Sequence, residues 1–168
     1  MDKISLERLA FKKGFYFALG IGMAVFLGLN LLFAAIGHGI ADDFNIANIL
    51  EYLLGPATVA PYAATSAMYN TLFLASENGG AIVFLNIGYL ISPTVAAIIT
   101  GWLSGAGKWL AIGTWFLIAG ICAVILYVIN IAILNYNVPE EIFKTLLPGI
   151  IVGIFYGIFA ILINPELL

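Results

Sequence analysis

The apolar stretch PGIIVGIFYGIFAILIN, residues 148–164, has a glycine at every fourth position: Gly149, Gly153 and Gly157. Residues four apart lie on nearly the same face of an α-helix, so the three glycines predict a flat groove along one side. In a lipid bilayer such a groove lets a second helix approach closely, because no side chain holds the two backbones apart. The stretch therefore predicts a transmembrane helix with a close helix-packing contact.

The composition indicates a membrane location for nearly the whole chain. Of the 168 residues, 63% are hydrophobic and only 9% are charged. Soluble domains carry roughly a quarter charged residues, so most of this surface must face a lipid bilayer. At about 20 residues for each span, the length allows four to six spans and little else. The net charge of −3 gives no indication of a nucleic-acid partner.

We expect an all-α integral membrane protein, with residues 1–168 forming one multi-pass domain. A short interfacial helix over residues 2–13 would lead into a bundle of five transmembrane helices, at residues 15–36, 56–76, 81–103, 109–133 and 145–163. The alternative is four spans plus a re-entrant segment, because residues 52–76 contain the helix-breaking pair Gly55-Pro56. A break of this kind is allowed only where protein or water covers the freed backbone groups.

Basic residues favour a cytoplasmic N-terminus in a protein of the cell membrane. Four of the six Lys and Arg residues lie within the first 13 positions, and basic flanks stay on the cytoplasmic side. With five spans Lys144 is inside and Lys108 outside, and with four spans the two exchange sides. The C-terminus is outside with five spans and inside with four, so its side stays open.

Small residues recur at four-residue spacing in other spans as well. One stripe lies in the first span and another in the third: Gly20, Ala24 and Gly28, then Gly88, Ser92 and Ala96. Small residues let transmembrane helices pack closely, so these stripes predict further helix-packing interfaces.

The sequence lacks the residue patterns of common membrane chemistry. No Asp, Glu, Lys or Arg falls inside any of the five expected spans, whereas proton pumps and proton-coupled carriers use such residues. A single histidine cannot supply both axial ligands of a bis-histidine haem, and there is no cysteine–histidine cluster for zinc. We therefore expect no enzymatic activity and no cofactor.

A weak candidate for a metal site follows the first span. His38, flanked by two glycines that we expect to end the helix, is followed by Asp42 and Asp43. The three side chains would form a site on the outer surface, or simply a solvated loop. We also expect Asp42 or Asp43 to cap a short amphipathic helix, at residues 41–51, on the membrane surface.

The second expected span has one polar side. On a helical wheel, five side chains share an arc: Thr58, Tyr62, Thr65, Ser66 and Tyr69. This arc would line a path for a neutral solute, because it carries no charge. The alternative is a buried helix whose hydroxyl groups bond to neighbouring helices or to their own carbonyls.

These patterns favour a membrane protein without catalytic chemistry of its own. It would be a packing or assembly subunit of a membrane complex, or a protein that associates with copies of itself. The alternative function is a small oligomeric channel or facilitator for a neutral solute.

Overall fold

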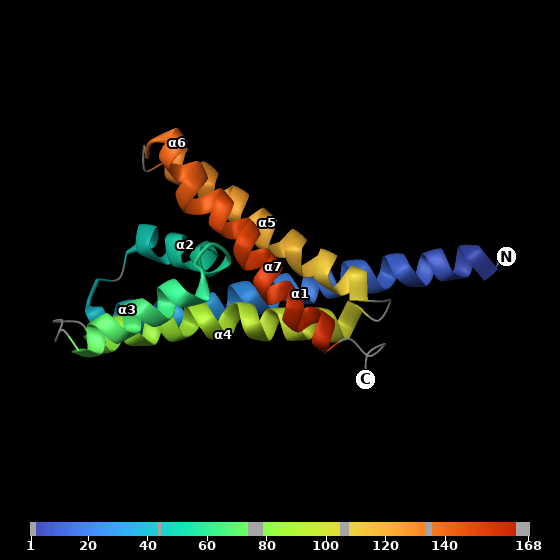
Figure 1. The fold of residues 1–168 in the computed structure, drawn as a ribbon, viewed down its shortest axis with the longest axis horizontal. Helices are drawn as coiled ribbons and strands as arrows, with labels where there is room; N and C mark the ends of the chain where they lie inside the picture. The colour runs from blue at the N-terminus through green and yellow to red at the C-terminus, as the bar shows by residue number, and fades with distance from the viewer. Residues whose placement is uncertain (1–2, 44, 74–78, 105–107, 134–135, 164–168) are drawn as a thin grey trace.

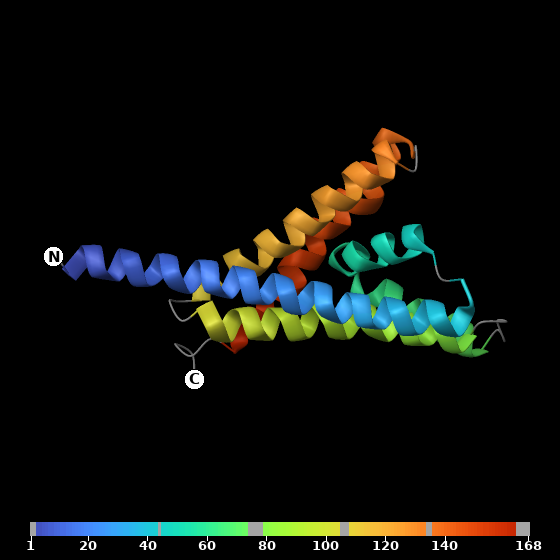
Figure 2. The same cartoon turned by 180° about the vertical axis from the view of Figure 1, so that it is seen from behind.

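The computed structural model describes residues 3–43, 45–73, 79–104, 108–133 and 136–163, and every regular element within them is helical. Helix α1 (Lys3–Ala41) lies beside α4 (Gly79–Ser104), and α5 (Lys108–Ala132) lies beside α7 (Leu147–Leu162). Figures 1 and 2 show the second pair inclined across the first. The two antiparallel pairs form the frame of the molecule.

Among the described residues, four helical segments are long and apolar enough to cross a membrane: Gly14–Ala41, Gly79–Ser104, Lys108–Ala132 and Val138–Leu162. The chain is therefore consistent with an integral, multi-pass membrane protein. The fifth span, expected at residues 56–76, is not confirmed, because helix α3 covers only the 13 residues Pro61–Phe73. At a rise of about 1.5 Å per residue it reaches about 20 Å, less than the roughly 30 Å of a bilayer core.

Helix α1 is longer than expected at both ends. Residues 3–13 continue into the span without a break, so a separate interfacial helix is not confirmed. The expectation that the glycines around His38 end the helix is wrong, since α1 runs through them to Ala41. Gly37 instead serves packing, because a Cβ atom there would collide with the side chain of Leu85 on α4.

Residues 46–73 fold into a helical hairpin. Helix α2 (Ile46–Leu54) is followed by a 3-10 turn, η1 (Gly55–Ala57), and then by α3. Figures 1 and 2 show α2 entering from the end of the molecule where α1 finishes, and α3 returning toward that end. The break falls at Gly55-Pro56, as in the alternative interpretation of the sequence. We call α2, η1 and α3 together the hairpin.

Hydrogen bonds satisfy the backbone at the hairpin tip. Thr58 donates both its backbone N–H and its hydroxyl to the carbonyl of Gly55, at 2.8 and 2.9 Å. From α1, the fully buried Asn30 donates its Nδ2 hydrogen to the carbonyl of Leu53, at 2.8 Å. Backbone N–H and C=O groups at a helix end lose their helical partners, and where they are buried from water they need other ones. These bonds therefore stabilise the break.

The three glycines of the C-terminal stretch face α5 of the same chain. A Cβ atom on any of them would meet an α5 side chain at 3.0 Å or less: Ala123 for Gly149, Phe116 for Gly153 and Ile112 for Gly157. The flat groove therefore holds α5 and α7 together inside one molecule.

The other two stripes of small residues have opposite surroundings. Gly88, Ser92 and Ala96 are buried within the bundle, where a Cβ atom at Gly88 would collide with Tyr52 and Phe33. Gly20, Ala24 and Gly28 are exposed on the outer face of α1, and a Cβ atom at Gly20 or Gly28 would meet nothing within 4 Å.

The core lies where the two helix pairs cross. Trp115 on α5 is fully buried and packs edge-on against Phe26 of α1 and Tyr156 of α7, with ring centroids 5.7 and 6.2 Å apart. Large aromatic rings fill this crossing.

Candidate functional site

A polar cavity of about 540 Å³ lies between the hairpin, α5 and the residues 136–145 that lead into α7. Its wall combines Gly55, Thr58 and Val59 of the hairpin tip with Leu126 and Asn130 of α5. The volume falls within the range of about 300–1,000 Å³ that is typical of small-molecule sites. We call this cavity the chamber.

The opposite wall of the chamber is the start of the last helix. Helix α6 (Val138–Glu141) continues through a π-helical turn, η2 (Ile142–Leu146), into α7. The last span therefore begins near residue 138 instead of the expected residue 145. Pro139 lies in the first helical turn, where its missing N–H costs nothing, so it starts the helix instead of excluding it.

The π-helical turn accommodates a second proline. Pro148 has no N–H to donate to the carbonyl of Lys144, so it cannot complete a regular α-helix there. The N–H of Leu147 donates to the carbonyl of Ile142 five residues earlier, which is the π-helical pattern. Glu141, just before this turn, and Thr145, within it, are buried, while Phe143 and Lys144 are exposed.

Glu141 is the central charged group of this wall. Only 4% of it is exposed, and its Oε2 atom accepts hydrogen bonds from Asn130 Nδ2 and Thr145 Oγ1, both at 2.8 Å. A buried carboxylate needs such donors, because it has lost its contact with water. Asn130 is 5% exposed, and its Oδ1 atom has no hydrogen-bond partner within the described part of the chain.

Glu141 was not among the candidate residues, because the expected last span began only at residue 145. The available signal was the four-residue spacing of Glu141 and Thr145, which aligns them on one helical face. A polar face at the end of a span, opposite Asn130, indicates a polar contact between helices.

The mouth of the chamber carries an ion pair. Lys144 Nζ lies 2.5 Å from Glu140 Oε1, and more than half of each side chain is exposed. Exposed pairs of this kind contribute little stability, about 0–1 kcal/mol. The pair does balance one positive with one negative charge, and it leaves Glu51 and Glu141 as the other charged groups of the described lining.

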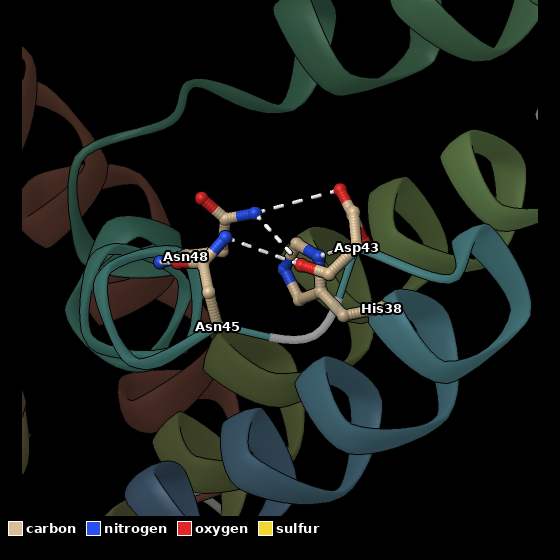
Figure 3. Close-up of polar contacts among 4 residues, drawn as sticks. All are labelled: His38, Asp43, Asn45 and Asn48. Atoms are coloured by element: carbon tan, nitrogen blue, oxygen red, sulfur yellow. Dashed lines mark hydrogen bonds and ion pairs between the residues drawn. The ribbon is translucent and has the colours of Figure 1, made fainter.

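The metal candidates lie at the turn between α1 and α2 (Figure 3). His38 Nδ1 is 2.9 Å from Asp43 Oδ1, and Asn48 Nδ2 is 3.2 Å from the Asp43 carbonyl. Asn45 caps α2 by accepting the N–H of Asn48, at 2.8 Å, so neither aspartate is the cap. Asp42 is exposed with a φ of 54°. No group of three His, Cys, Asp or Glu within the described ranges is placed to hold a metal ion.

A smaller cavity of about 200 Å³ adjoins this turn. It is lined by His38, Tyr52 and Asn86, and it shares Glu51 and Tyr89 with the chamber. Burial, and to a lesser extent the neighbouring Tyr89, raises the pKa of Tyr52 well above its usual range. Tyr52 therefore keeps its proton, and its hydroxyl donates a hydrogen bond to the carbonyl of Leu85 on α4.

The polar arc of residues 58–69 is divided in the structure. Thr58 is buried and lines the chamber, whereas Tyr62, Thr65, Ser66 and Tyr69 are exposed on α3. The hydroxyl of Thr65 donates within its own helix, to the carbonyls of Pro61 and Tyr62, at 3.0 Å. The path along this arc stays a prediction.

Comparison with family models, curated proteins and solved structures finds no match to this chain.

Proposed function

We propose that the protein is a membrane facilitator that binds a small polar solute in the chamber and passes it across the bilayer. The observation that carries this proposal is the non-helical tip of the hairpin, residues 58–60, beside a polar cavity. Irregular backbone at membrane depth occurs where it is covered by protein or lines a wet cavity. Broken helices of this kind hold the solute in many transporters, because their free backbone groups face the site.

In this proposal the hairpin is a re-entrant segment between the first two of four spans. Helix α2 has nine residues and reaches about 14 Å, roughly half the bilayer core. Figure 1 shows α1 and α5 beginning toward the same end of the molecule, where α7 finishes. The basic residues 3–13 and Lys108 then lie on the cytoplasmic side, and the chamber opens on the outer side of the cell membrane.

Solute flux through reconstituted protein tests the proposal. Val59 is half-buried in the chamber wall, so Val59→Trp fills the cavity with an indole ring. Val128→Trp is the matched control, because Val128 is exposed on α5 and does not line the chamber. Liposome swelling is measured in isotonic glycerol and urea. Uptake of labelled choline is measured in potassium-loaded liposomes with valinomycin, where potassium efflux balances the charge, and protein-free liposomes are the reference in each case.

We expect flux of at least one probe above the protein-free rate. Val59→Trp should abolish this flux, and Val128→Trp should leave it unchanged. Rates equal to those of protein-free liposomes for all three probes contradict the proposal. Equal flux in both variants contradicts the assignment of the chamber as the site.

A second role, as a self-associating subunit, is favoured by the outward stripe on α1. Gly20, Ala24 and Gly28 face outward with open space beside the two glycines, which is the surface that a second transmembrane helix fits. Gly28→Leu would block such a contact. Gly113→Leu is the control, since Gly113 on α5 also has nothing within 4 Å.

The mass of the particle in mild detergent is the measurement for this second role. Association through the stripe predicts a dimer or larger particle that Gly28→Leu converts to a monomer, while Gly113→Leu does not. A monomeric wild type, or a mass that Gly28→Leu leaves unchanged, rules out this contact.

A further inference from the structure

We propose that the solute of the chamber is a small organic cation, held by the carboxylate of Glu141. This inference rests on the proposed function, since it names the class of solute that the same chamber takes. The sequence alone favoured a neutral solute, because the polar arc of residues 58–69 carries no charge. Glu141, buried in the chamber wall, changes the chemistry of the site.

The charge of the chamber favours a cation. Its described lining contains the three carboxylates Glu51, Glu140 and Glu141 against the single ammonium of Lys144. Lys144 pairs with Glu140 at the mouth, at 2.5 Å. Two carboxylates are then left without a counter-charge, and one of them, Glu141, is nearly fully buried. A cleft lined by one sign of charge concentrates solutes of the opposite sign.

The deep wall of the chamber contains a hydrogen-bond acceptor that has no partner among the described residues. Asn130 Nδ2 and Thr145 Oγ1 already donate to Glu141, and Thr58 Oγ1 already donates to the Gly55 carbonyl. Asn130 Oδ1, by contrast, is a buried acceptor without a partner within the described residues. An ammonium group supplies hydrogen-bond donors and a positive charge together, whereas a carboxylate or phosphate supplies neither.

Size and aromatic lining favour an organic cation over a bare metal ion. The chamber holds about 540 Å³, whereas one water takes about 30 Å³ in the liquid, so a single ion would leave most of the space to water. Tyr89 and Tyr136 contribute aromatic side chains to the lining. Tyrosine rings attract alkylammonium groups through cation–π interactions.

Three probes of equal chain length separate the solute classes. Purified full-length protein in detergent is titrated calorimetrically with 1,4-diaminobutane, 1,4-butanediol or succinate, which end in ammonium, hydroxyl or carboxylate groups. We expect the diamine to bind at least about tenfold more tightly than the diol, and succinate to show no binding.

Two neutralising variants locate the site. Glu141→Gln keeps the shape of the side chain and removes its charge, so it should weaken diamine binding at least about tenfold. Glu51→Gln should also weaken it, and it lies at an exposed position where folding is not at risk. Asp42→Asn is the control, because Asp42 is exposed outside the chamber and asparagine tolerates its positive φ.

The outcomes distinguish this inference from the proposed function. Tight diamine binding that is lost in both Gln variants and retained in Asp42→Asn supports the cation. Flux or binding of the neutral probes equal to that of the diamine overturns the cation and leaves the facilitator standing. Diamine binding unchanged by either Gln variant also overturns the inference. Absence of both binding and flux for every probe removes the facilitator together with it.

Discussion

Asn130 on α5 donates a hydrogen bond from Nδ2 to the Oε2 atom of Glu141 on α6, at 2.8 Å, and this bond joins two helices at the wall of the chamber. Both side chains are at least nine-tenths buried. Hydrogen bonds between neutral groups in membranes contribute modestly to stability. A buried carboxylate makes a stronger hydrogen bond, and leaving it without donors costs more free energy. The pair fixes where the negative charge of the chamber lies.

Removal of the Asn130 amide should therefore destabilise the protein. Asn130→Leu leaves Glu141 with one donor, Thr145, in place of two, and we expect the free energy of unfolding to fall by about 2 kcal/mol. Unfolding in mixed micelles with increasing SDS, followed by circular dichroism, measures this loss. Asn137→Leu is the control, because Asn137 is an exposed amide at the same cavity and makes no capping bond. Equal losses in the two variants contradict the prediction.

The membrane-spanning helices could be predicted from the sequence, since each depends mainly on its own apolar run. The span expected at residues 81–103 corresponds to α4, which begins two residues earlier and ends one residue later. The span expected at residues 109–133 corresponds to α5, and each of its ends differs by one residue. A span needs only about 20 apolar residues, and no knowledge of its neighbours.

The hairpin and the chamber could not be predicted in the same way. Residues 56–76 are apolar enough to suggest a span, whereas the bonds of Asn30 and Thr58 at the tip help to stabilise the break. The role of Glu141 depends on the pairing of α5 with α7, because Asn130 comes from the other helix. Such contacts between distant residues leave no local pattern in one sequence.

The glycine at the centre of the C-terminal stretch should be essential for packing. Gly153→Leu forces a side chain into α5, where even a Cβ atom would lie 3.0 Å from Phe116 Cδ2. We expect a loss of about 1–3 kcal/mol, the usual cost of overpacking. The same SDS unfolding measures it. Gly120→Leu on α5 is the control, since a Cβ atom there meets nothing within 4 Å. An unchanged stability of Gly153→Leu would show that α5 and α7 do not pack along this groove.

The amide of Asn30 should hold the hairpin tip in place. Asn30→Leu removes the bond to the Leu53 carbonyl, but it also removes a buried Oδ1 atom that has no partner among the described residues. Loss of the bond lowers the free energy of unfolding and removal of the unpartnered oxygen raises it, so the two effects oppose each other. We therefore expect the change to be seen locally, at the hairpin tip. Amide hydrogen exchange in α2 and η1 should become roughly fivefold faster, which corresponds to one bond of about 1 kcal/mol.

Asn86→Leu is the control for this exchange experiment. Asn86 Nδ2 donates to the Ile82 carbonyl within α4, so its loss breaks no bond to the hairpin. Exchange in α2 should then stay at the wild-type rate. An Asn30→Leu protein with unchanged exchange at the tip would mean that other contacts alone hold the break.

Cysteine labelling should decide between four and five spans. The native Cys122 is 1% exposed and is replaced by alanine, so that each variant carries one introduced cysteine. Asp42→Cys, Lys108→Cys and Lys144→Cys all lie at exposed positions outside the hairpin. With four spans and a re-entrant hairpin, residues 42 and 144 share one side of the membrane and residue 108 lies on the other. A membrane-impermeant maleimide added to sealed cells should therefore label positions 42 and 144 alone. Labelling of positions 42 and 108, with position 144 protected, would mean that residues 56–76 cross the membrane and that the chamber does not open where we place it.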